Sequence, residues 1–257
     1  MGKLIIPVAM LAFMACNDQP SQKVTTNVQR THWGFGNVRG KPETIESKTV
    51  NFDSTGKAQG DSTQSLGVYD KDGSIIKETN KDNSGTTTIH EVAYYTNGFI
   101  KEEKTTVNGV VQVRVTIDSF VNGQNVGAKV WDSTGKQIGY CDAINNKYGQ
   151  VTRGKTFHMN GKLQFAWESK FDGPLYIGGS STDTAGNIVR QSTIKRNDKG
   201  DEVEEHYTWF KNGDTTTGTL TYKYDSYDEI DNWTQQSTYK NGKLISVTKR
   251  AITYYKD

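Results

Sequence analysis

The chain has 257 residues, with 31 Lys and Arg against 29 Asp and Glu, which gives a formal net charge of +2. This balance, with both signs interspersed along the chain, argues against nucleic acid as a partner. An apolar fraction of 33% and a mean hydropathy of −0.73 exclude a thick two-sided core, while an aromatic fraction of 11% excludes a disordered chain. We therefore expect a folded protein whose strands mostly bury one face.

Residues 1–15 have the pattern of an export signal. Lys3 precedes an apolar stretch from Leu4 to Met14, which is followed by the small residue Ala15. The stretch is shorter than the roughly 20 residues that a membrane-spanning helix needs. We therefore expect the mature chain to leave the cytoplasm.

The residues Phe13-Met14-Ala15-Cys16 resemble the lipobox of bacterial lipoproteins. The resemblance implies cleavage before Cys16 and attachment of lipid to the Cys16 thiol, so that the membrane is a partner through the N-terminal lipid. An ordinary cleaved signal, with Cys16 as an incidental residue, is the alternative. Residues 16–32 are polar and without periodicity, which predicts a flexible tether. With Asn17 after the cysteine, the resemblance indicates an outer-membrane lipoprotein of the cell envelope and leaves open which leaflet the protein faces.

Residues 33–257 have the pattern of one β-repeat domain, with a turn signal at roughly one-strand spacing. Between turns apolar and polar side chains alternate, as in residues 111–117, where the branched aliphatic side chains share one face of a strand. The spacing predicts an all-β fold, a long antiparallel meander of about 14–15 strands. Because a flat sheet rarely holds so many, we expect a curled or wrapped sheet, with a small β-propeller as the alternative. The turn glycines are Gly56, Gly73, Gly85, Gly98, Gly109, Gly123, Gly135, Gly149, Gly161, Gly173, Gly186, Gly200, Gly213 and Gly242, and a further turn is expected near Tyr227 and Asp228.

Two kinds of turn are expected. Pairs such as Asn108-Gly109 and Asn160-Gly161 predict two-residue type I′ hairpins, because both residues adopt positive φ at low cost. In the longer kind, such as Asp132-Ser-Thr-Gly135, the first side chain can cap the turn backbone and the glycine closes it in the left-handed region.

This pattern resembles the YD (Rhs-type) repeat proteins and related bacterial repeat lipoproteins. The resemblance spans about residues 45 to 257 and implies consecutive β-hairpins in an extended sheet that curls or wraps. It implies no activity. The matching residues are Tyr69-Asp70-Lys-Asp-Gly73, Trp131-Asp132-Ser-Thr-Gly135-Lys136, Tyr222-Lys-Tyr224-Asp225, Asn232-Trp233 and Tyr239-Lys-Asn241-Gly242.

The sequence contains no catalytic constellation, and we expect no enzyme activity, no cofactor and no metal site. Cys141 has no neighbouring histidine, which predicts a buried structural cysteine. In the compact acidic stretch from Asp201 to Glu205, alternation places Glu202 and Glu204 on one strand face. We interpret this stretch as a solvated edge, and not as the carboxylate pair of a glycosidase. The histidines lie in four different segments without the spacing of metal ligands: His32, His90, His158 and His206.

Tryptophan side chains are the candidates for ligand binding, because exposed rings can stack on sugars or on peptide side chains. On an inner face the same rings would form the core, which is the interpretation we favour. The candidates are Trp131, Trp167, Trp209 and Trp233.

We therefore expect a lipid-anchored extracytoplasmic β-repeat protein that offers a binding or scaffold surface to a protein or glycan, without catalysis. One alternative is a cell-surface glycan-binding protein or glycoside hydrolase. Another is an immunity-like protein that neutralises a secreted toxin. The oligomeric state is left open.

Overall fold

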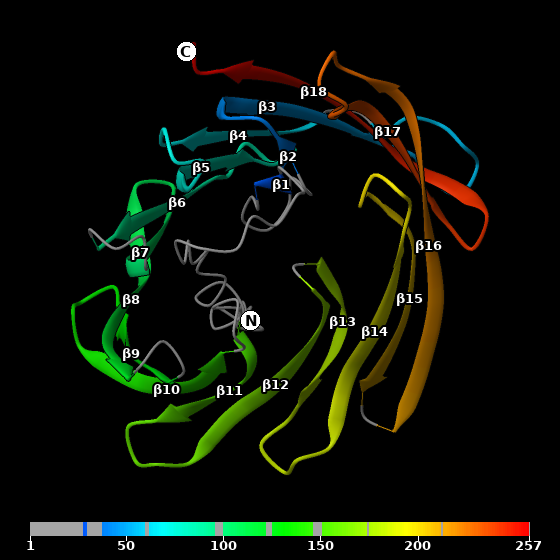
Figure 1. Cartoon of the computed structure of the whole chain (residues 1–257). Helices are drawn as coiled ribbons and strands as arrows, with labels where there is room; N and C mark the ends of the chain where they lie inside the picture. Colours follow the sequence, from blue (N-terminus) through cyan, green and yellow to red (C-terminus); the bar gives the residue numbers. More distant parts are fainter. Residues whose placement is uncertain are drawn as a thin grey trace.

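A computed structural model describes residues 28–29, 38–59, 62–95, 100–121, 125–145, 151–173, 175–211 and 213–256; the side chains of residues 28, 29, 118–121, 125, 126 and 145 are not described. The expected signal at 1–15, the lipid site Cys16 and the tether up to residue 27 lie outside these residues. The described chain contains strands, turns and bends, and no helix. Figure 1 shows the strands arranged around a ring.

Sixteen strands form a closed antiparallel barrel in which each strand from β3 to β18 pairs with its neighbours in the chain, and β18 pairs with β3 to close the ring. Two short strands, β1 and β2, pair with each other and lie within the ring in Figure 1. The strands are β1 (Val28–Gln29), β2 (Val38–Arg39), β3 (Pro42–Asn51), β4 (Thr63–Tyr69), β5 (Ile75–Lys81), β6 (Thr87–Tyr94), β7 (Ile100–Val107), β8 (Val110–Val121), β9 (Asn125–Asp132), β10 (Gln137–Asn145), β11 (Val151–His158), β12 (Leu163–Asp172), β13 (Leu175–Thr182), β14 (Ile188–Arg196), β15 (Glu202–Lys211), β16 (Asp214–Tyr227), β17 (Trp233–Lys240) and β18 (Lys243–Tyr254).

The all-β antiparallel meander is confirmed, whereas the open curled sheet and the propeller are both wrong. The strand number is sixteen in the barrel, slightly above the prediction. Closure depends on nine residue pairs between β18 and β3, from Ser246 with Asn51 to Tyr254 with Pro42. This seam satisfies the hydrogen-bonding groups of both terminal barrel strands, which an open sheet would leave as exposed edges.

Most turns share one conformation of five residues. In the turn at 53–57, the Asp53 N–H donates to the carbonyl of Lys57 at 2.9 Å, and the Gly56 N–H donates to the carbonyl of Asp53 at 3.0 Å. The Asp53 carboxylate accepts from the N–H groups of Thr55 and Lys57. The same backbone pattern recurs at 70–74, 82–86, 132–136, 158–162, 183–187, 197–201 and 228–232.

Positive φ occurs where these turns require it. Gly56 and Gly135 both have φ of +81°, and the turn expected near Asp228 is present with Asp231 at φ +66° in the glycine position. Asn108-Gly109 is a two-residue turn, as predicted. Asn160-Gly161 is not: it belongs to the five-residue turn 158–162, because Lys162 supplies the closing carbonyl.

The turns alternate between the two ends of the barrel. We call rim A the end with the turns at 53–57, 82–86, 108–109, 132–136, 158–162, 183–187 and 241–242, and rim B the end with the turns at 70–74, 197–201 and 228–232. From one turn of a meander to the next, the strand direction reverses, while the chain keeps advancing across the sheet in the same sense. Two successive turns are therefore related by a half-turn about an axis in the plane of the sheet, and this half-turn exchanges the two faces of the sheet. The same turn conformation therefore presents its flanking residues to opposite faces of the sheet at the two rims.

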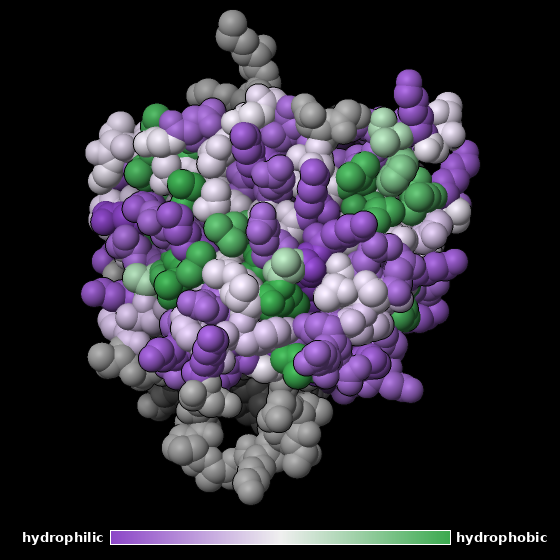
Figure 2. Space-filling model, turned by 90° about the horizontal axis from the view of Figure 1, so that it is seen from above, coloured by the Kyte–Doolittle hydropathy of each residue, from purple (hydrophilic) through white to green (hydrophobic). Residues whose placement is uncertain are grey.

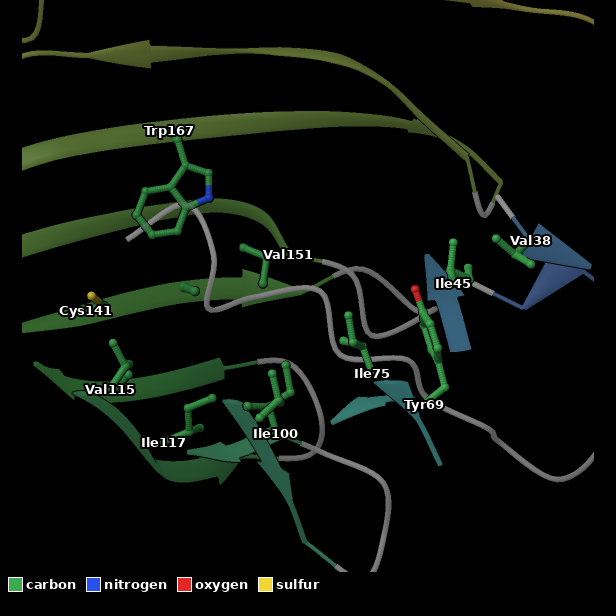
Figure 3. Close-up of a cluster of buried hydrophobic side chains, with 13 residues drawn as sticks. Val38, Ile45, Tyr69, Ile75, Ile100, Val115, Ile117, Cys141, Val151 and Trp167 are labelled. Atoms are coloured by element: carbon green, nitrogen blue, oxygen red, sulfur yellow. The ribbon is translucent and has the colours of Figure 1, made fainter. Parts of the chain in front are cut away.

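The buried core lies on the inner wall toward rim B, as this rule requires. Tyr69 and Ile75, which flank the rim-B turn 70–74, are 0% and 2% exposed and pair across β4 and β5. Figure 3 shows them converging with side chains from strands around the ring and with Val38 of β2. The cluster consists of Val38, Ile45, Tyr69, Ile75, Val92, Ile100, Val115, Ile117, Ala128, Cys141, Ala143, Val151 and Trp167. The prediction of a buried Cys141 is confirmed.

The outer wall is charged at the middle of its strands. Lys104 of β7 forms an ion pair with Glu91 of β6 at 2.5 Å, and Lys48 of β3 lies opposite Lys249 of β18. On the face seen in Figure 2, hydrophilic side chains cover most of the surface and separate the hydrophobic ones into small groups. Only one face of each strand is therefore apolar over most of its length, as the composition predicted.

Candidate functional site

One position on the inner wall, next to a rim-B turn, carries charged side chains where equivalent positions carry apolar or aromatic ones. Two of them place apolar or aromatic pairs inward: Tyr69 with Ile75, and Tyr227 with Trp233. At the equivalent positions of the turn 197–201, a charged pair replaces the apolar one, Arg196 with Glu202. A charged pair in this position has to be held by other polar groups, because water is limited there.

Arg196 is held by four hydrogen bonds. Its Nη2 donates to the Glu202 carboxylate at 2.9 Å and to the carbonyl of Tyr176 at 2.9 Å. Its Nε donates to the same Tyr176 carbonyl at 3.1 Å, and Nη1 donates to the carbonyl of Gly200 at 2.8 Å. The guanidinium is thus fixed between β13 and the start of β15. Burial raises the pKa of Glu202, and the Arg196 guanidinium offsets part of that shift.

A second ion pair lies on the same inner wall, nearer to rim A. The Arg190 guanidinium lies 3.4 Å from the Glu205 carboxylate and stacks over the Trp209 ring at 4.9 Å from its centroid. Arg190 is paired with Trp209 across β14 and β15. Trp209 is 48% exposed, so its ring offers an open face on the inner wall. A planar guanidinium on an indole fixes the ring and leaves its other face for stacking.

Two tyrosines complete the group. Burial raises the pKa of Tyr222, and the neighbouring Glu205 carboxylate raises it further. Burial also raises the pKa of Tyr176, and the neighbouring Ser192 hydroxyl offsets part of that shift. Both phenols therefore stay protonated at neutral pH and keep their capacity to donate hydrogen bonds.

Together these side chains combine hydrogen-bond donors, acceptors and an aromatic platform on four consecutive strands. Guanidinium and phenol groups donate, carboxylates accept, and an exposed indole stacks on flat or ring-shaped ligands. This set suits a ligand with several hydroxyl groups. We call it the inner polar cluster; its members are Tyr176, Arg190, Arg196, Glu202, Glu205, Trp209 and Tyr222.

The structure separates the four tryptophan candidates. Trp167 and Trp233 are 7% and 6% exposed and belong to the interior. Trp131 lies on the outer wall, where its Nε1 donates to the Thr116 hydroxyl at 3.0 Å. Trp209 is the candidate that lies in the inner polar cluster. Whether it binds a ligand stays a prediction.

The placement of Glu202 and Glu204 on one face is wrong. Glu202 lies on the inner wall with Arg196, whereas Glu204 forms an outer ion pair with Lys195 at 2.5 Å and accepts from His206 at 2.7 Å. The cause is a register shift between Lys195 and Arg196, which interrupts the alternation. Sequence analysis also missed Arg190, because a charged residue in an alternating strand is normally assigned to the outer face.

A further polar network lies at rim B and holds β2 against the barrel. Asn232, 1% exposed, accepts from the Arg39 N–H at 2.6 Å and donates to the Arg39 carbonyl at 3.0 Å. It also donates to the Tyr254 hydroxyl at 2.8 Å. Next to it, burial lowers the pKa of Arg250 to about 10, and its guanidinium stacks 3.6 Å from the centroid of the Trp233 ring. We interpret this network as structural, because it joins β2 to rim B through the backbone of Arg39 and Asn232 is almost fully buried.

Among the described residues, no group of three or more His, Cys, Asp or Glu side chains is placed to hold a metal ion. The part of the chain that the structure describes has no helix suited to crossing a membrane.

Comparisons with known proteins do not assign the chain to a family. No family model matches the chain, and no curated protein matches it. Among solved structures, a porin-like protein from Bacteroides uniformis is 10% identical, with a TM-score of 0.42, over 82% of this chain and 98% of that one. A DUF1329 family protein from Desulfovibrio piger is 10% identical, with a TM-score of 0.22, over 83% of this chain and 86% of that one. The side chains of the inner wall are therefore the evidence for function.

Proposed function

We propose that this protein is an extracytoplasmic binding barrel that takes a hydroxyl-rich ligand, of the glycan class, at the inner polar cluster and does not catalyse a reaction. The observation that carries the proposal is the Arg196–Glu202 pair, at a position where the other rim-B turns place Tyr69–Ile75 and Tyr227–Trp233. The side chains of this pair are 12% and 33% exposed, and a partly buried ion pair is a poor source of stability compared with an apolar pair. Its use here favours a role in recognition.

The charged outer wall supports a barrel surrounded by water. A membrane-spanning barrel carries an outward apolar band about 25 Å tall, in which charged side chains are costly. Here the ion pair Lys104–Glu91 lies at the middle of β6 and β7 on the outer wall, and the ion pair Lys195–Glu204 lies on the same wall nearer to rim B. The proposed location is the cell envelope, with the barrel tethered to the outer membrane through lipid on Cys16 and the residues between Cys16 and β1.

The tether is tested by substitution. Cys16→Ala should release the protein from the membrane fraction of its native host, and mass spectrometry of the wild type should find the acylated cysteine. An unmodified Cys16 in the native host contradicts the lipid anchor and leaves the ligand proposal standing.

Ligand binding is tested with a double variant that keeps the fold. Arg196→Leu with Glu202→Leu replaces the charged pair by an apolar one, as the other rim-B turns have, so the barrel should fold with similar stability. Binding of soluble hexasaccharides, both neutral and uronic-acid types, is measured by calorimetry and by the fluorescence change of Trp209, with Trp209→Phe as the optical control. We expect the wild type to bind at least one class and the double variant to lose it. Equal affinity of the two proteins would contradict the site.

A glycoside hydrolase is the second candidate, and one observation favours it. Burial raises the pKa of Glu202, and Glu205 lies close enough to contribute to that shift. A carboxyl with a raised pKa beside a second carboxyl is the arrangement of a glycosidase acid and its partner. Release of reducing ends from the same hexasaccharides, abolished by Glu202→Gln, would establish hydrolysis; bound but uncleaved sugar would establish a binding protein.

A further inference from the structure

The outer wall carries an apolar patch at rim A, over β9–β12. Two side chains on it or beside it are strongly exposed, Ile138 at 43% and Met159 at 54%. Tyr140 and Phe157 stack with ring centroids 5.0 Å apart and planes at 19°. Leu163 pairs with Phe157 across β11 and β12. We call this surface the outer apolar patch; its members are Trp131, Ile138, Tyr140, Phe157 and Leu163, and the exposed Met159 lies next to it in the turn 158–162.

The patch follows from the turn geometry. Trp131 and Gln137 flank the turn 132–136, and Phe157 and Leu163 flank the turn 158–162. Since both turns are at rim A, their flanking residues face outward, whereas the equivalent residues at rim B face the core. The inner wall at this level is occupied by Thr156, which is 3% exposed. The rings of the patch are therefore not used in the core.

Cationic side chains surround the patch. Arg114 stacks over Trp131 with its guanidinium 5.1 Å from the ring centroid, and Lys129 lies beside Tyr140 in register. Exposed lysines follow in both adjoining turns, Lys136 and Lys162.

The acidic groups nearby are fewer and partly engaged. The Asp132 carboxylate accepts from the N–H groups of Thr134 and Lys136 within its own turn. Glu102 lies 3.7 Å from the Arg114 guanidinium. Asp142 is exposed one step further from rim A, next to Lys155. The surface thus presents aromatic and aliphatic side chains framed by an excess of positive charge.

We propose that the outer apolar patch docks on the interfacial region of an anionic lipid bilayer. Tryptophan and tyrosine rings favour the headgroup level of a membrane, where one end of the ring is apolar and the other is wet. Each Lys or Arg near an anionic surface adds about 1 kcal/mol of attraction. The patch has both components on one side of the barrel wall, so it would hold the barrel against the membrane on its side. The inference is independent of the ligand site and of the lipid on Cys16.

The test measures directly whether the patch enters the interfacial region of a membrane. In the full chain with Cys16→Ala, Cys141 is 1% exposed and should stay unlabelled in the folded protein, so a single cysteine at Met159→Cys can carry an environment-sensitive nitrobenzoxadiazole probe. A matched probe at Ile76→Cys reports a side chain of comparable exposure, 39%, at the start of β5. Phosphatidylglycerol vesicles should shift the emission of the probe at position 159 to shorter wavelength and leave the probe at position 76 unchanged. No shift at 159, or equal shifts at both positions, would overturn the proposal.

A separate variant tests how much the positive charges around the patch contribute to docking. Lys136→Gln with Lys162→Gln should raise the lipid concentration for half-maximal shift by about 30-fold, which corresponds to about 1 kcal/mol for each lysine. An unchanged concentration, or an equal response to phosphatidylcholine vesicles, would overturn the choice of an anionic surface. In native envelopes, a photo-reactive residue at Ile138 should crosslink to lipid. Crosslinking to one dominant protein instead would overturn the proposal in favour of a protein partner.

Discussion

The contact between Gly154 and Trp167 provides a quantitative test of the packing inside the barrel. The two residues are paired across β11 and β12, and the indole lies flat over the glycine. A Cβ atom on Gly154 would lie 2.2 Å from Cζ2 and 2.4 Å from Cη2 of the Trp167 ring. Trp167 is 7% exposed and belongs to the buried cluster, so the ring has little room to move.

Gly154→Ala should therefore destabilise the protein. Overpacking of a core costs about 1–3 kcal/mol, and the gain from restricting the unfolded chain returns about 0.4–1 kcal/mol. The net loss is about 1–2 kcal/mol, which lowers the melting temperature by roughly 2–8 °C for a domain of this size. Thermal unfolding followed by circular dichroism, together with urea unfolding, measures both quantities.

A double-mutant cycle separates the ring contact from any effect on the strand itself. With Trp167→Leu, the side chain no longer covers Gly154, and the added methyl group should be neutral or stabilising. The coupling between the two substitutions should be of the order of 1–3 kcal/mol. If Gly154→Ala costs the same with Trp or Leu at position 167, or costs less than 0.5 kcal/mol in the wild type, the packing argument fails.

Three further predictions concern other parts of the barrel. Asn232→Leu removes both hydrogen bonds to the backbone of Arg39, so trypsin should cleave after Arg39 much faster than in the wild type, as mass spectrometry of timed digests would show; unchanged cleavage would contradict the role of Asn232 in holding β2. Burial raises the pKa of the Cys141 thiol to about 11, so iodoacetamide at pH 8 should label it only after unfolding, and labelling of the folded protein would refute its burial. Hydrogen bonds from Ser84 and Asn187 lower the pKa values of Asp82 and Asp183, which carbon-13 NMR titration should place below the ordinary value of about 3.9. Because the folded carboxyls are the stronger acids, their contribution to stability is present above that ordinary pKa and is lost as pH falls through the lowered one; titration at or above 3.9 would contradict this.

Much of the local structure could be predicted, since it depends on neighbours in the chain. The turn at 132–136 follows from an aspartate that caps the backbone and a glycine that accepts positive φ, and both are visible in the sequence. The alternation in residues 113–117 likewise gave the correct face, with Val113, Val115 and Ile117 buried. The placement of Val111 with them is wrong, because a register shift pairs it with Thr106 on the opposite face.

Closure and the site could not be predicted in the same way. The pairing of Ile252 with Ile45 joins residues at opposite ends of the chain, and no local pattern specifies it. The inner position of Glu202 depends on a register shift beside Arg196, which reverses the face that simple alternation assigns. Once the five-residue turn conformation is known, however, the sequence alone tells whether the two residues that flank a turn face inward or outward, because this depends only on the rim at which the turn lies.

The seam between β18 and β3 also restricts how such a protein can arise and diverge. An antiparallel ring has to contain an even number of strands, because an odd number would force the last strand to run parallel to the first. Gain or loss of one strand would also exchange the outward-facing and inward-facing sides of every strand that follows. Duplication or deletion of a complete up-and-down unit avoids both problems. We therefore expect relatives of different circumference to differ by whole hairpins, with their first and last barrel strands still joined.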